Sequence, residues 1–131
     1  MASRTDVRFH CTKRARRSAR NSKHGVDARC EAVTLVLAGN PEFGVPVAGH
    51  PGLRKMRVQV PAARLGKRGG YRCIYRKARI DEIDYVVFLA VYFKGDVDDL
   101  AAELYDLLRA EAEEVLGDPI EVDWEDAAAI D

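Results

Sequence analysis

The longest apolar stretch of the chain, residues 83–93 (IDYVVFLAVYF), restricts the fold more than any other feature. It is apolar at almost every position, which is typical of a central β-strand that is buried on both faces. Two other segments with strand character, residues 53–60 and 71–78, precede it. The connections PAARLGKRGG and RIDE are short, and short connections favour antiparallel pairing because parallel strands need a long crossover. We therefore expect an antiparallel sheet.

Helices are expected before this sheet. Residues 7–11 alternate weakly and predict a short first strand, after which Thr12 can act as the N-cap of a helix that begins KRARRSARNSK. A second helix is predicted over residues 26–39, where apolar residues recur along one side and Gly39-Asn40-Pro41 forms the stop.

A further helix and an acidic segment are expected after the sheet. Apolar residues at three- and four-residue steps predict a helix over residues 97–116, with Asp96 as its N-cap and Gly117 at its end. We treat residues 1–117 as one domain and residues 118–131 as an acidic C-terminal extension. Two alternatives for the extension remain open: a frayed, solvated end, or a segment that lays Ile120, Val122 and Trp124 beside the basic strands and screens them.

The net charge of zero conceals a strong segregation of charge. Residues 1–79 carry 19 basic and 4 acidic side chains, a net charge of +15, whereas residues 80–131 carry 2 basic and 17 acidic ones, a net charge of −15. A basic region of this size commonly binds phosphate. The alternative is that the two halves neutralise each other across the fold. The basic helix likewise has two interpretations, a solvated face or a surface for RNA or an acidic partner.

Several classes of site and location are not supported. The three cysteines are odd in number and far apart, and the three histidines lack metal-ligand spacing, so we expect neither a disulfide framework nor a metal site nor a cofactor. No apolar run approaches the roughly 20 residues of a membrane span. Residues 1–8 lack the apolar stretch of a signal peptide, so a cytoplasmic protein is expected.

Basic residues gather in two strand motifs, GLRKMR and GKRGGYRCIYR. Strand alternation places Arg54 with Met56 on one face, and Lys55 with Arg57 on the other. In the second motif, two adjacent glycines let the backbone turn sharply or approach a ligand, and basic side chains surround them: Lys67, Arg68 and Arg72.

Together with NPEFG and VYFKGDVDDL, these motifs resemble the RelE/HigB-like toxins of bacterial type II toxin–antitoxin systems, over about residues 37–108. The resemblance implies an α+β, RelE-like fold with two N-terminal helices, a small antiparallel sheet of three to four strands and a C-terminal helix. It also implies a ribosome-dependent, metal-independent endoribonuclease that cleaves translated mRNA. The implied partners are a cognate antitoxin, the ribosome and mRNA, and no membrane.

This chemistry assigns roles to the basic residues. Cleavage without a metal needs a deprotonated 2′-hydroxyl, a neutralised phosphate and a protonated leaving oxygen. Lys55 is the candidate base, because a lysine can act as one when neighbouring cations lower its pKa. Arg72 is the expected phosphate clamp, assisted by Arg57 and Lys67, and Tyr92 would stack on or orient a base. Further contacts with RNA are expected from Arg54, Lys67, Arg68 and Lys94.

Two other functions remain compatible with the sequence. One is a ParE-like inhibitor of DNA gyrase that is not a nuclease, although the density of Lys and Arg in the strand motifs favours the enzyme. The other is an inactive relative that only binds antitoxin. The loop AGHPGL, with His50 before a proline, departs from the smaller, glycine-rich turn expected of the family.

Overall fold

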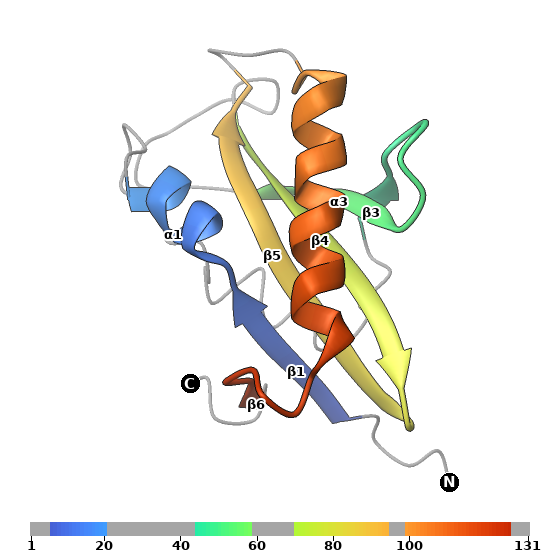
Figure 1. Cartoon of the computed structure of the whole chain (residues 1–131). Helices are drawn as coiled ribbons and strands as arrows, with labels where there is room; N and C mark the ends of the chain where they lie inside the picture. The colour runs from blue at the N-terminus through green and yellow to red at the C-terminus, as the bar shows by residue number, and fades with distance from the viewer. Residues whose placement is uncertain (1–5, 21–43, 59–69, 95–98, 127–131) are drawn as a thin grey trace, which may run out of the picture.

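The computed structural model describes residues 6–20, 44–58, 70–94 and 99–126. Within these ranges the fold is α+β, with one mixed sheet in the strand order β2-β3-β4-β5-β1-β6. The strands are β1 (Asp6–Cys11), β2 (Val45–Pro46), β3 (Leu53–Val58), β4 (Tyr71–Ile80), β5 (Ile83–Phe93) and β6 (Glu125–Asp126). The helices are α1 (Lys13–Arg20) and α3 (Ala102–Gly117), and Figure 1 shows α3 running along β4 and β5.

The three strands that the sequence predicts form the middle of the sheet. β3 pairs antiparallel with β4, and β4 pairs antiparallel with β5, as expected. β4 runs two residues further than predicted because its hairpin turn needs only Asp81 and Glu82. Both have positive φ, 52° and 67°, as tight two-residue hairpins require.

The prediction of a purely antiparallel sheet of three to four strands is wrong. β1 pairs with β5 in parallel, from Asp6 opposite Ile83 to Cys11 opposite Phe88. A short connection would require the two strands to be antiparallel. More than half of the chain separates β1 from β5, so a parallel arrangement is possible. β2 and β6 have two residues each, too short for alternation to reveal them.

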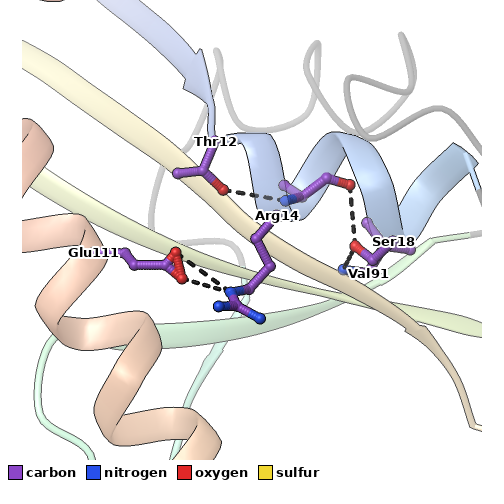
Figure 2. A network of polar contacts seen from close by, with 6 residues as sticks. Thr12, Arg14, Ser18, Val91 and Glu111 are labelled. Atoms are coloured by element: carbon purple, nitrogen blue, oxygen red, sulfur yellow. Dashed lines mark hydrogen bonds and ion pairs between the residues drawn. The ribbon is translucent and has the colours of Figure 1, made fainter.

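The N-terminal helix begins as the sequence predicts. The Thr12 Oγ1 atom accepts a hydrogen bond from the Ala15 amide at 3.1 Å, which is the geometry of an N-cap. The Thr12 amide donates to the Phe88 carbonyl at 3.1 Å, and the Val91 amide donates to Ser18 Oγ at 3.0 Å (Figure 2). Beyond the end of β1, the hydrogen bonds to this edge of β5 therefore come from Thr12 and from Ser18 on α1. The predicted second helix, residues 26–39, lies outside the described residues.

The sheet separates two apolar layers. The first lies against α1 and includes Phe9, Ala15, Cys73, Tyr75 and Phe88. The second lies against α3 and includes Leu53, Ile74, Leu89, Tyr105 and Leu108. None of the helices in the described ranges combines the length and apolar character needed to cross a membrane.

Helix α3 begins later than predicted. Its N-cap position is Ala101, with extended backbone angles, and residues 99–101 are not helical. The late start has a local cause. The Asp99 carboxylate accepts a hydrogen bond from the Leu100 amide at 2.9 Å, and such side-chain to backbone bonds compete with helix formation. Asp96, the expected cap, lies outside the described residues. The helix ends at Gly117, as predicted.

The described part of the acidic extension is packed against the fold. β6 pairs antiparallel with β1, opposite Arg8 and Phe9. Trp124 donates its indole N–H to the Pro119 carbonyl at 2.6 Å, and its ring lies 4.6 Å from that of Tyr85. Neither alternative for this segment is correct as stated. Its described residues are not frayed, and they lie at the opposite edge of the sheet from β3.

The expected alternation in this segment is confirmed only in part: Val122 and Trp124 are half-buried and Glu121 and Asp123 are exposed, but Ile120 is 93% exposed. The turn that Trp124 closes with Pro119 replaces an extended strand there. The division of the chain at residue 117 stays a prediction.

Candidate functional site

The four residues predicted to be catalytic come together on one face of the sheet. Arg57 on β3 is opposite Arg72 on β4, and Arg72 is opposite Tyr92 on β5. Directly opposite residues in an antiparallel pair point to the same side. Lys55 occupies the next position on that side of β3, two residues from Arg57. We call Lys55, Arg57, Arg72 and Tyr92 the basic cluster.

The basic cluster lies on the side of the sheet that α3 covers. Lys55 is opposite Ile74, and Leu53 on the same side of β3 is 1% exposed. Both apolar residues belong to the core layer packed against α3. The basic cluster therefore borders the apolar layer that packs against α3.

Arg72 is the most unusual charge of the cluster. The residue is 5% exposed, and its guanidinium donates to the Tyr71 carbonyl at 3.2 Å. Burial lowers the pKa of Arg72, the positive charge of Arg57 lowers it further, and Tyr92 opposes the shift. Neither arginine forms an ion pair with another described residue. A poorly hydrated cation beside a like charge is a candidate anion-binding group.

Lys55 has an acidic neighbour that the sequence did not reveal. Its Nζ atom lies 3.7 Å from Oδ1 of Asp99, which precedes α3. The same oxygen accepts the Tyr105 hydroxyl at 2.5 Å. That hydrogen bond lowers the pKa of Asp99, while burial opposes the shift. Burial, together with the Asp99 carboxylate, raises the pKa of Tyr105.

The Tyr105 hydroxyl also interacts with Tyr92. A polar chain therefore runs from Lys55 through Asp99 and Tyr105 to Tyr92. The sequence offered one signal for part of it, since Tyr105 stands with Leu108, Ala112 and Leu116 at the helical spacing that faces the sheet. No pattern distinguishes Asp99 from the other acids around it.

Arg54, predicted to bind RNA, points to the other side of the sheet. This follows the predicted alternation, which separates it from Lys55 and Arg57. Its Nη2 atom donates to the Gly44 carbonyl at 2.5 Å, and the Gly44 amide donates to the Tyr75 hydroxyl at 3.0 Å. Arg54 therefore links the chain before β2 to the sheet in the α1 layer.

Of the remaining predicted RNA contacts, the structure describes Lys94, which lies at the end of the sheet near Arg72. The Lys94 amide donates to the Gly70 carbonyl at 3.2 Å, which joins the end of β5 to the start of β4. Lys67 and Arg68 lie outside the described residues.

His50 lies near this network, although the sequence assigned it no role. Its ring centroid is 4.8 Å from that of Tyr105, and its Nδ1 atom lies 3.4 Å from Asp106. Within the described ranges, no three His, Cys, Asp or Glu side chains gather as metal ligands do.

The acids of α3 neutralise part of the basic half of the chain. Arg76 pairs with Glu113 at 2.8 Å, and Arg14 on α1 pairs with Glu111 at 2.5 Å (Figure 2). Neutralisation of the two halves across the fold is therefore confirmed in part, and phosphate binding by the basic region stays a prediction. Several basic side chains are paired within the fold, whereas Arg57 and Arg72 form no ion pair with another residue of the described ranges.

No family model matches the chain. Among solved structures, the chain is similar to a double arginine-to-alanine mutant of the E. coli toxin RelE in the free state. The two are 18% identical, with 81% of this chain and 93% of that chain covered and a TM-score of 0.48.

Proposed function

We propose that the chain is the toxin of a type II toxin–antitoxin pair, a ribosome-dependent and metal-independent endoribonuclease that cleaves translated mRNA. The observation that carries the proposal is the row of Arg57, Arg72 and Tyr92 across three strands, with Lys55 beside it on the same face. The motifs that resemble RelE/HigB-like toxins supply the same residues. A cognate antitoxin, the ribosome and mRNA are the proposed partners.

The row suits a scissile phosphate. Arg72 is held by its backbone bond and by burial, so its charge is oriented before the substrate arrives. A preorganised cation in a poorly hydrated site stabilises the developing charge of the transition state better than a mobile one does. Arg57 is exposed and adjacent, so the two guanidinium groups can share the phosphate oxygens.

Lys55 and Tyr92 flank this clamp. Lys55 forms an ion pair with Asp99, and its ammonium can stabilise charge or donate a proton to the leaving 5′-oxygen. A general base, the role that the sequence suggested, would have to be neutral and therefore free of this ion pair. We assign Lys55 to the acid side of the reaction, and the proton of the 2′-hydroxyl then passes to solvent water. Tyr92 is half-buried and can present its ring to a base.

Positioning of the substrate has to supply much of the rate. The basic cluster contains no histidine, so proton transfer within it is weak at neutral pH. Holding the mRNA in a reactive geometry can contribute a large share of the acceleration. We therefore expect cleavage on the ribosome and little cleavage of naked RNA.

The test is to induce the chain in cells and map the 5′ ends of transcripts. Cuts that follow the codon phase within translated regions support the proposal. Purified protein should cut mRNA on programmed ribosomes and leave the same RNA intact when it is naked. Rapid cutting of naked RNA would contradict ribosome dependence. Intact mRNA with DNA damage would favour the gyrase inhibitor, and antitoxin binding without either effect would favour the inactive relative.

A further inference from the structure

Asp99 is held in place by the fold, although its side chain is 59% exposed. The hydroxyl of Tyr105, a residue that is 2% exposed, donates to Oδ1 at 2.5 Å. The Leu100 amide donates to the same oxygen at 2.9 Å. A carboxylate with two donors from a buried ring and the backbone has little freedom to turn away.

Lys55 lies beside this fixed anion. Its Nζ atom is 3.7 Å from Oδ1 of Asp99, and its side chain is 27% exposed. A lysine ammonium sits at the end of a flexible four-carbon chain, so it occupies one position only if something holds it there. Asp99 is the only described acid that forms an ion pair with Lys55.

Stability does not explain the pair. Ion pairs with this exposure contribute about 0–1 kcal/mol. A carboxylate near a phosphate site also repels the substrate, so an acid there is unfavourable for binding. A carboxylate at this position is explained if its contribution to the reaction outweighs its repulsion of the substrate.

We propose that Asp99 is a positioning residue that holds the Lys55 ammonium beside the Arg57 and Arg72 row, oriented toward the phosphate of the bound mRNA. Tyr105 supports Asp99 through a hydrogen bond, and Asp99 in turn holds Lys55 through an ion pair. The inference rests on the proposed endoribonuclease function and adds a residue that acts through Lys55. Asp99 does not itself touch the substrate.

The test compares Asp99→Asn with the wild type on programmed ribosomes, and measures the affinity of both for an uncleavable 2′-deoxy oligonucleotide. Asp99→Asn should reduce kcat about tenfold to a hundredfold, the usual loss when a supporting residue is removed. Affinity for the oligonucleotide should stay equal or become tighter, because a negative charge has been removed near a polyanion. Asp99→Glu should recover part of the lost kcat.

Glu113→Gln is the matched control, because it removes an acid of α3 that pairs with a basic residue on the same face of the sheet, Arg76. It should leave kcat unchanged. A wild type that never cuts on ribosomes would refute the proposed function itself. If the wild type cuts and Asp99→Asn cuts equally well, the inference alone is wrong. Faster cutting by Asp99→Asn would make Asp99 a screen over the site, and a parallel loss of affinity and thermal stability would make it structural; either result overturns the inference.

Discussion

Arg57 on β3 and Arg72 on β4 are direct cross-strand partners, so two positive charges share one face of the sheet. Like charges at such positions destabilise a sheet, by about 0.2–1 kcal/mol. Burial of Arg72 at 5% exposure adds to the cost, because its charge is poorly hydrated there. The proposed phosphate site would offset this cost, because an anion bound between the two groups would neutralise both charges.

The first prediction is that Arg57→Gln makes the protein more stable. Removing one of the two like charges should raise the free energy of unfolding by about 0.2–1 kcal/mol, while weakening the affinity for an oligonucleotide. Urea unfolding and fluorescence anisotropy measure the two effects. Arg14→Gln is the control, since Arg14 is paired with Glu111 and its loss should not stabilise. A less stable Arg57→Gln would mean that the Arg57 side chain contributes packing that outweighs the repulsion.

The second prediction compares the loss of Arg72 with the loss of Arg76. The two arginines are four residues apart on the same face of β4. Arg72→Ala should cost roughly 2–4 kcal/mol of transition-state stabilisation, the range for losing one preorganised donor. Arg76→Ala should retain cleavage, because Arg76 is already bound to Glu113 at 2.8 Å. Initial rates on programmed ribosomes, with unfolding curves to confirm that both variants fold, check this. Loss of cleavage in Arg76→Ala with full activity in Arg72→Ala and Lys55→Ala would refute the assignment of the site.

Periodicity accounts for the part of the site that was predictable. Strand alternation separates Arg54 from Lys55 and Arg57, and the structure confirms that these residues lie on opposite sides. The short hairpin that joins β4 to β5 limits their pairing to an antiparallel register, which brings Tyr92 to Arg72. Both results depend only on contacts between residues close in sequence.

The contacts that were missed join distant parts of the chain. The parallel pairing of β1 with β5 and the ion pair of Arg14 with Glu111 each depend on where a remote segment packs. Asp99 was placed inside a predicted helix because the helical pattern continues through acids that face solvent. Its ion pair with Lys55 depends on where the start of α3 packs against β3, which no local pattern contains.

The third prediction concerns pH and His10 on β1. Its ring lies 5.7 Å from that of Trp124. Burial lowers the pKa of His10 below 6.5, Arg16 contributes in the same direction, and Asp123 and Glu125 oppose the shift. The native state therefore binds fewer protons than the unfolded state, so this contribution to stability is present above about pH 6.5 and is lost as the pH falls through the lower native pKa.

Urea unfolding at pH 7.5 and 5.5 checks the sign, with the emission of Trp124, the one tryptophan of the chain, as the signal. The wild type should lose more stability on acidification than His10→Gln does. Equal losses in the two proteins would show that other groups account for the pH dependence.

The last prediction concerns the C-terminal extension, tested with a chain that ends at Gly117. This chain lacks β6 and the packing of Trp124 on Tyr85, so its free energy of unfolding should fall by about 1–3 kcal/mol, the value of one large apolar side chain. Affinity for an oligonucleotide at physiological salt should change by less than about twofold. β6 lies three strands from β4, which is about 14 Å at the usual strand spacing and beyond the screening length of about 8 Å. Trp124→Ala in the full chain is the control and should reproduce the loss of stability with the same affinity. An affinity that rises severalfold on truncation, but not with Trp124→Ala, would mean that the acids of the extension reach the basic cluster after all.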